Sequence, residues 1–141
     1  HISQKKISLA HYVGELFLLC QHIRIQCSNG MVIMKYMVDI DNTICYNENS
    51  NYEDSKPDHV RIAKLNELYD KGHEIHYWTA RGGNSGKDWT ELTHQQLKEW
   101  NVKYTSIQMK KPVYDVWIDD RAINAKDFFG GYEIRSKYEG I

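Results

Sequence analysis

Short apolar runs alternate along the chain with segments in which apolar residues return every three or four positions. Runs at 34–38, 75–78 and 114–118 have the length and composition of buried strands, and a weaker run lies within 102–109. Apolar runs of this length, bounded by polar and glycine-containing stretches, are typical of strands that are buried in a sheet. We therefore expect one sheet built from these segments.

Between the apolar runs, apolar residues are spaced as on one face of a helix. Pro57 is expected to open a helix whose apolar face ends before Gly72, because proline suits the first helical position and glycine commonly stops a helix. A second helix is expected over 90–100 and a short one around 124–129. Strands that alternate with helices join through right-handed crossovers, which produce a mainly parallel sheet.

The length of 141 residues suits one compact domain. We predict an α/β fold over 34–141, a Rossmann-like three-layer sandwich with a mainly parallel sheet and no large cap domain. Residues 1–33 differ from the remainder, with one acidic residue against three basic ones. We expect them to form an N-terminal extension, which is either a helix with Leu9, Val13 and Leu16 on one face or non-native sequence.

Charge and cysteine content exclude several classes of protein. The 18 basic and 19 acidic residues give a net charge of −1, so no overall field attracts nucleic acid or an anionic membrane. No apolar run approaches the roughly twenty residues that span a bilayer. Cys20, Cys27 and Cys45 have the spacing of neither a zinc site nor a redox pair. We expect reduced thiols in a cytoplasmic protein without a membrane partner.

Two aspartate pairs directly follow apolar runs. Asp39 and Asp41 come after the first run, and Asp119 and Asp120 come after the last. Because ligands bind at the carboxyl edge of an open α/β sheet, these carboxylates are expected to converge there. Converging carboxylates repel one another unless a cation offsets their charge, and hard oxygen ligands beside a phosphate favour Mg²⁺. The pattern predicts a metal-dependent phosphoryl-transfer site in which these aspartates are the metal ligands.

Other polar residues fall at the same predicted edge. Thr79 ends the second run, and Lys111 precedes the last run, with Lys110 as the alternative lysine. Arg81 either reaches a phosphate or carboxylate of the substrate or ties its turn to Asp120.

Two loops are expected beside the site. The polar segment 44–56 suits a flap, and within it Cys45 either lines the site or is a small packed residue. The segment 82–87 contains Gly-Asn-Ser-Gly-Lys, but Asp88 stands where a nucleotide-binding phosphate loop requires Ser or Thr. We interpret 82–87 as a mobile loop at the mouth of the site.

The four motifs of the haloacid dehalogenase-like superfamily have counterparts here in the same order, over about residues 34–130. They are Asp-Ile-Asp-Asn-Thr at 39–43, Thr79, Lys111 and Asp-Asp at 119–120. The chain also resembles the small phosphatases of capsular and surface-polysaccharide biosynthesis. That similarity rests on Trp-Thr-Ala-Arg-Gly at 78–82, Lys-Pro at 111–112 and Ile-Asp-Asp-Arg-Ala-Ile at 118–123.

The resemblance implies a role for each motif residue. Asp39 would attack phosphorus and form an aspartyl-phosphate, and Asp41 would protonate the leaving oxygen and later accept a proton from water. Thr79 would hydrogen-bond a phosphoryl oxygen, while Lys111 would neutralise charge in the transition state. Mg²⁺ would be bound by Asp39, by the backbone carbonyl of Asp41, by Asp119, and by Asp120 directly or through water.

These roles predict an Mg²⁺-dependent phosphomonoester hydrolase with an open site and a small phosphorylated substrate. The resemblance to polysaccharide-biosynthesis phosphatases favours a sugar phosphate. One alternative is a polynucleotide 3′-phosphatase, which a basic groove beside the site would favour. The other is a binding or regulatory module that keeps the fold without turnover.

Overall fold

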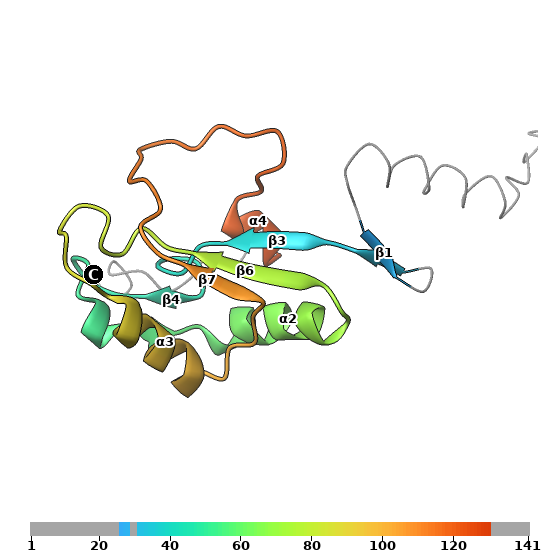
Figure 1. Ribbon diagram of the computed structural model, residues 1–141, viewed down its shortest axis with the longest axis horizontal. Helices are drawn as coiled ribbons and strands as arrows, with labels where there is room; N and C mark the ends of the chain where they lie inside the picture. The colour runs from blue at the N-terminus through green and yellow to red at the C-terminus, as the bar shows by residue number, and fades with distance from the viewer. Residues whose placement is uncertain (1–25, 29–30, 131–141) are drawn as a thin grey trace, which may run out of the picture. The chain divides into compact units, whose positions relative to one another are not determined.

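The chain divides into two compact units, His1–Lys35 and Tyr36–Ile141. The computed structural model describes residues 26–28 and 31–130 (Figure 1). All the candidate site residues predicted from the sequence belong to the second unit.

The described part of the first unit contains a short hairpin. In it, β1 (Gln26–Ser28) pairs antiparallel with β2 (Met31–Ile33), and Cys27 lies opposite Val32. The helix predicted within 1–33 lies outside the described residues, and the nature of that segment as an extension stays a prediction.

The second unit is built on a three-stranded sheet with the order β3-β6-β7. Strand β3 spans Lys35–Val38, β6 spans Glu74–Trp78 and β7 spans Ser106–Gln108. Strands β6 and β7 are parallel, with Tyr77 opposite Ile107. Figure 1 shows β3 beside β6 with the same direction. The mainly parallel α/β sheet predicted from the sequence is confirmed, and its three strands end at one edge.

Side chains alternate regularly along β6. Ile75 and Tyr77 are buried, whereas Glu74, His76 and Trp78 are half-buried. Successive side chains of a strand point to opposite faces, so the alternation defines one face of the sheet that is closed by the core.

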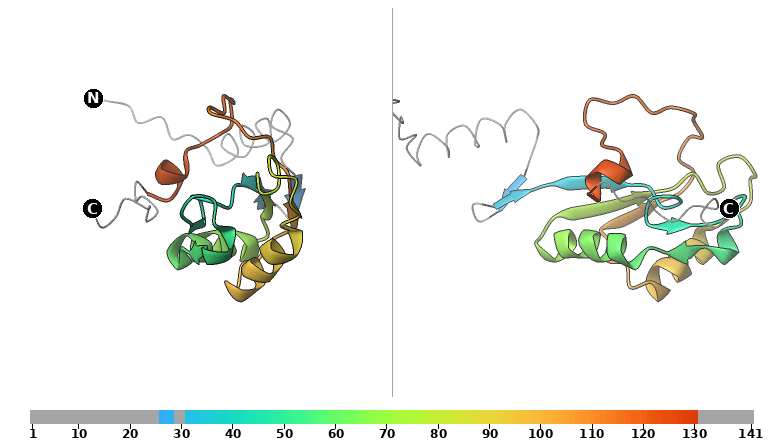
Figure 2. Two further views of the ribbon diagram at one scale, coloured as in Figure 1. Left: turned by 90° about the vertical axis from the view of Figure 1, so that its left-hand side faces the viewer. Right: turned by 180° about the vertical axis from the view of Figure 1, so that it is seen from behind.

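Two helices cover this closed face. Helices α2 (His59–Asp70) and α3 (Thr90–Glu99) lie on the same side of the sheet (Figures 1 and 2). Ile62 and Leu65 of α2 and Leu97 of α3 belong to one buried cluster with the inward side chains of β6. Burying a side chain of this size contributes roughly 1.5–3 kcal/mol to folding. The core therefore lies directly beneath the strands that carry the site.

The start and end of α2 follow from local chemistry. The Asp58 carboxylate accepts a hydrogen bond from the backbone N–H of Arg61 at 3.1 Å and caps the first turn. Gly72 follows the helix with φ +96°, a left-handed conformation that glycine adopts readily. The predicted helix is thus confirmed, but it begins after Pro57, which lies in the short strand β5 (Lys56–Pro57).

A small β-structure connects β3 to α2. Strand β4 (Cys45–Tyr46) pairs antiparallel with β5, and the 3₁₀ helix η1 (Tyr52–Asp54) lies between them. The described residues hold no large cap between β3 and β6 or between β6 and β7, as predicted. None of their helices is long and apolar enough to pass through a membrane.

The short helix predicted near 124–129 is confirmed as α4 (Ala125–Phe128). The ring of Phe128 lies 6.0 Å from that of Tyr36 on β3, and Lys64 on α2 donates a hydrogen bond to the Phe128 carbonyl at 2.7 Å. These contacts place α4 beside β3 and α2.

The strand predicted at 114–118 is wrong in this structure. The chain from 112 to 124 forms neither helix nor strand and makes a wide loop (Figure 1). Val116 is 74% exposed and Ile118 is 93% exposed. An apolar run shows that a segment suits a buried strand, but a strand also needs a neighbour that pairs with it, and this segment has none among the described residues.

Candidate active site

Two segments that leave the sheet at its carboxyl edge meet at an ion pair. Asp39 directly follows β3, and its Oδ1 lies 2.8 Å from Nζ of Lys111, which follows β7. The Lys111 side chain is 9% exposed and that of Asp39 is 37% exposed, so the carboxylate remains open to solvent while the ammonium is largely covered. Lys110 is exposed, and the lysine that contacts Asp39 is Lys111.

The surroundings of Asp39 act on its charge in opposite directions. Burial raises the pKa of the Asp39 carboxyl above its ordinary value, because a charged carboxylate loses solvation. The hydrogen bond and the charge of Lys111 lower the same pKa, and the nearby Asp41 carboxylate raises it. Lys111 is therefore the main group that favours an ionised Asp39.

Thr79 links the ends of β6 and β7 through its backbone. Its N–H donates to the Gln108 carbonyl at 3.0 Å, and its own carbonyl accepts from the Lys111 N–H at 2.8 Å. The Thr79 side chain is fully buried, and its Oγ1 accepts from the Arg81 N–H at 3.2 Å. Thr79 thus holds the segment that brings Lys111 to Asp39.

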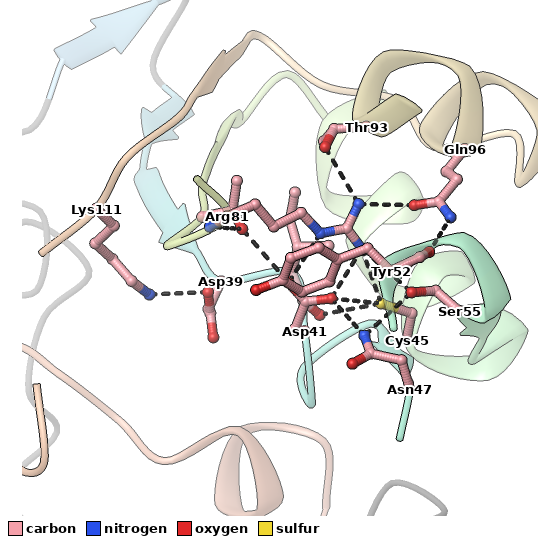
Figure 3. A network of polar contacts seen from close by, with 12 residues as sticks. Asp39, Asp41, Cys45, Asn47, Tyr52, Ser55, Arg81, Thr93, Gln96 and Lys111 are labelled. Carbon is pink, nitrogen blue, oxygen red and sulfur yellow. Dashed lines mark hydrogen bonds and ion pairs between the residues drawn. The ribbon is translucent and has the colours of Figure 1, made fainter. Parts of the chain in front are cut away.

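Asp41 faces a different partner from Asp39 (Figure 3). Its Oδ2 accepts from Nε of Arg81 at 2.9 Å, and its Oδ1 accepts from Nη2 of Arg81 at 2.8 Å. Asn47 also donates to Oδ1 at 2.8 Å. The Asp41 side chain retains 19% exposure, so this two-point contact does not seal the carboxylate from solvent. Arginine and carboxylate form their strongest pairs in this arrangement.

The Arg81 guanidinium is buried and fully engaged. Its Nη1 donates to Thr93 Oγ1 at 3.2 Å and to Gln96 Oε1 at 2.7 Å, both on α3. Its Nη2 also lies 3.4 Å from Ser55 Oγ, and its Cζ lies 4.7 Å from the centre of the Tyr52 ring. The structure therefore places Arg81 on Asp41 and α3, a third arrangement beside the substrate contact and the Asp120 contact considered from the sequence.

A signal for this placement exists in the sequence. The buried positions Ile75, Tyr77 and Thr79 alternate along β6, and the same period continues to Arg81. Extending the alternation beyond the strand end would have directed Arg81 to the covered face of the sheet.

Cys45 is a packed residue that also contacts the site. Its side chain is fully buried, and its Sγ lies 3.6 Å from Oδ1 of Asp41. Burial raises the pKa of the Cys45 thiol far above its ordinary value, which keeps it protonated and a hydrogen-bond donor.

The second aspartate pair lies on the exposed segment that follows Lys111. Asp119 accepts from the Arg121 N–H at 2.8 Å, and this hydrogen bond is the main cause that lowers the pKa of the Asp119 carboxyl. Asp120 Oδ2 lies 3.9 Å from Nε of Arg121. Among the described residues, no three His, Cys, Asp or Glu side chains converge as metal ligands, so the predicted set of four carboxylates is not gathered.

The glycine-containing loop after β6 has a defined shape. Gly82 has φ +78°, and a Cβ there would lie 2.7 Å from the Lys87 carbonyl oxygen. The Lys87 ammonium lies 3.9 Å from the centre of the Trp89 ring, a cation–π contact, and that ring packs against Tyr52 at 5.1 Å. The loop is thus folded back toward η1.

Comparison with known proteins supports the fold. No protein-family model matches the sequence, and no curated protein matches it significantly. A solved structure from Vibrio cholerae, described as a structural-genomics target, matches with a TM-score of 0.62 and 30% sequence identity. The match covers 70% of this chain and 89% of the Vibrio cholerae chain. The chain belongs to the same family as that Vibrio cholerae protein.

The description of the Vibrio cholerae relative names neither an activity nor a ligand. The relationship therefore supports the α/β architecture, whereas the chemistry of the site has to be inferred from its residues. Those residues provide a solvent-accessible carboxylate paired with a covered ammonium, and a second carboxylate fixed by a buried guanidinium.

Proposed function

We propose that this protein is an Mg²⁺-dependent phosphomonoester hydrolase that acts through an aspartyl-phosphate on Asp39. The observation that carries the proposal is the contact between Asp39 and Lys111 at the carboxyl edge of the sheet, with Thr79 at the end of the strand between them. A nucleophile and a cation for phosphoryl oxygens thus come from separate motifs to one edge, as phosphoryl transfer requires, and the buried Thr79 holds the segment that carries the cation.

Asp39 supplies the nucleophile in this proposal. One carboxylate oxygen forms a bond to phosphorus while the bond from phosphorus to the leaving oxygen breaks, and the leaving oxygen receives a proton from Asp41. Water then attacks the aspartyl-phosphate, gives its proton to Asp41 and releases inorganic phosphate. Lys111 favours the ionised form of Asp39 against the effect of burial, and it would offset the charge of the phosphoryl oxygens during the reaction.

The proposed ligands are of the chemical type that Mg²⁺ prefers, although the described residues do not gather Asp119 and Asp120 beside Asp39. Asp39 offers a hard carboxylate oxygen that stays exposed to solvent, and burial disfavours its charge unless cations are near. Asp39, the backbone carbonyl of Asp41 and Asp119 would hold the ion, with Asp120 directly or through water. When bound, Mg²⁺ would neutralise charge on the phosphoryl group.

A small phosphorylated metabolite, a sugar phosphate above all, is the proposed substrate. The absence of a large cap in the described residues supports a site open to solvent, and the resemblance to polysaccharide-biosynthesis phosphatases favours a sugar. The proposed compartment is the cytoplasm, where the buried thiol of Cys45 stays reduced.

The decisive experiment measures phosphate release, with and without Mg²⁺, from a panel of sugar phosphates, nucleotides and 3′-phosphorylated oligonucleotides. We expect turnover of a sugar phosphate and none in the Asp39→Asn variant. Asp70→Asn, which alters an exposed aspartate paired with Lys103, is the matched control. Intact-mass analysis after rapid quenching should show one added phosphoryl group in the wild type and none in Asp39→Asn.

Two results would count against the proposal. Preference for oligonucleotides would favour the polynucleotide 3′-phosphatase. Failure to hydrolyse any member of the panel, including p-nitrophenyl phosphate, would favour a module without turnover.

A further inference from the structure

A buried guanidinium fixes the second aspartate of the site. The Arg81 side chain is 0% exposed, although it carries a full positive charge. Removing a charged group from water costs several kcal/mol, and replacing a buried pair with apolar residues is often neutral or stabilising. The Arg81–Asp41 pair is therefore poorly explained as a source of stability, and because Asp41 lies close enough to Asp39 to act on its charge, the pair favours a role in orienting Asp41.

The two oxygens of Asp41 are used unequally. A carboxylate oxygen has about two acceptor positions. Oδ1 accepts from Nη2 of Arg81 at 2.8 Å and from Nδ2 of Asn47 at 2.8 Å, and the Cys45 thiol also lies 3.6 Å from it. Oδ2 accepts from Nε of Arg81 at 2.9 Å, and its other neighbour is Thr79 Oγ1 at 3.5 Å, the outer limit of a hydrogen bond. Oδ2 is the oxygen that retains capacity to exchange a proton.

Helix α3 prevents the guanidinium from turning. Nη1 of Arg81 donates to Thr93 and to Gln96, and Gln96 in turn donates to the backbone carbonyl of Tyr52. These hydrogen bonds hold the guanidinium from the side opposite to Asp41 and so fix the orientation of its plane (Figure 3). A lysine at this position would offer a point charge and could not reproduce the planar fork.

We propose that Arg81 is a positioning residue that presents Oδ2 of Asp41 for proton transfer to and from substrate and water. This inference rests on the proposed phosphatase function. Arg81 does not touch the substrate, because its donors are occupied by Asp41, α3 and the segment at Ser55. Its contribution is confined to the steps in which Asp41 gives or takes a proton.

The test compares substrates whose leaving groups differ in their need for a proton. The p-nitrophenolate group leaves readily without one, whereas an alkoxide needs one, so the loss of a general acid affects alkyl phosphates most. We expect Arg81→Lys to lower kcat/KM for an alkyl phosphate. The factor of this loss should be at least about ten times the factor by which phosphoryl transfer from p-nitrophenyl phosphate slows, in line with the size of acid catalysis. Asp41→Asn should show the same preference, and the double variant should be no worse than Asp41→Asn.

Controls separate positioning from folding. Arg61 is also buried, at 2% exposure, and it donates to the Thr43 carbonyl at 3.2 Å, so Arg61→Lys removes a similar fork that does not reach Asp41. We expect Arg61→Lys to change the turnover of both substrates by the same factor. If Arg81→Lys does not fold, Gln96→Met leaves Arg81 in place, removes one acceptor of Nη1, and should give a smaller loss with the same preference for the alkyl phosphate.

The outcomes distinguish this inference from the proposed function. If the wild type hydrolyses neither substrate, the phosphatase proposal fails. Suppose that the wild type is active and that both Arg81→Lys and Gln96→Met lower the turnover of the two substrates by the same factor. Arg81 is then a structural residue, and the positioning role is wrong. An additive double variant would also overturn it, because residues acting in one step are not additive.

Discussion

Nζ of Lys111 lies 2.8 Å from Oδ1 of Asp39, although 72 residues separate them in the chain. The two residues follow the outer strands of the sheet, β7 and β3, and the contact passes over the end of the central strand β6. The Thr79 carbonyl at that end accepts from the Lys111 N–H at 2.8 Å. This ion pair therefore forms only when the ends of all three strands lie side by side.

Removing this ammonium is expected to shift the pH dependence of activity. Burial raises the pKa of Asp39 and Lys111 lowers it, so Lys111→Met leaves the effect of burial unopposed and the pKa rises further. Because the nucleophile must be ionised, the acid limb of the kcat/KM profile should move to higher pH, and the plateau should fall with the loss of phosphoryl binding. Lys110→Met, at an exposed position, is the control. An unmoved acid limb in Lys111→Met would contradict the pairing.

The same carboxyl is expected to leave a signature in stability. A group whose pKa is higher in the folded protein binds its proton more tightly there, so its contribution is complete below the ordinary value of about 3.9 and is lost as pH rises through the folded pKa. The free energy of unfolding of the wild type relative to Asp39→Asn should therefore decrease from acidic to neutral pH. Urea unfolding of both proteins across this range measures the difference. An increase toward neutral pH would show that Lys111 outweighs burial.

Most elements of the second unit follow from local patterns. β6 shows strict alternation from Glu74 to Trp78, and α2 has a capping Asp58 and a terminating Gly72, so each could be predicted without its neighbours. The three strand ends then place Asp39, Thr79 and Lys111 at one edge by topology alone. The resemblance to known motifs selects the same three residues, and their catalytic roles stay predictions.

The features that could not be predicted from the sequence depend on contacts with distant segments of the chain. The segment at 114–118 has the composition of a strand, but composition does not say whether a neighbouring strand pairs with it, and here it is exposed. The sequence leaves the substrate and Asp120 as the alternatives for Arg81, because a lone arginine at a strand end does not identify its acceptor. Its contacts with Asp41 and Gln96 join segments 40 and 15 residues away, which no local window contains.

Mg²⁺ should be needed for activity and should act through Asp119. We expect Asp119→Asn to raise the Mg²⁺ concentration required for half-maximal turnover and to reduce the rise in melting temperature that Mg²⁺ causes, because a carboxylate ligand is lost. Asp115→Asn changes an exposed aspartate of the same segment and should leave both quantities unchanged. Equal behaviour of the two variants would remove Asp119 from the metal site.

The second unit should keep its activity without the first 33 residues. Every proposed catalytic residue lies in Tyr36–Ile141, and the described core that supports them belongs to the same unit. Residues 34–141 should therefore be folded by circular dichroism and should hydrolyse p-nitrophenyl phosphate with Mg²⁺. A folded but inactive fragment would show that residues 1–33 contribute to the site.

Gly82 and Gly86 provide a matched pair for testing the loop after β6. Both have positive φ, +78° and +66°, so alanine is strained at either position. A Cβ at Gly82 would also lie 2.7 Å from the Lys87 carbonyl oxygen, whereas nothing lies within 4 Å at Gly86. Gly86→Ala should therefore destabilise by about 1 kcal/mol, the strain of a left-handed conformation alone.

Gly82→Ala should destabilise by about 2–4 kcal/mol, since the backbone contact adds to the same strain. The substitution should also affect the site, because displacing the 82–87 loop would shift Arg81. Arg81 directly precedes this loop and holds Asp41. Urea midpoints measure the stability difference, and the ratio of alkyl phosphate to p-nitrophenyl phosphate turnover measures the effect on Asp41. If Gly82→Ala and Gly86→Ala have equal midpoints, the close approach to Lys87 is not part of the folded loop. If the midpoints differ but the substrate ratio does not, the loop is structurally independent of Asp41.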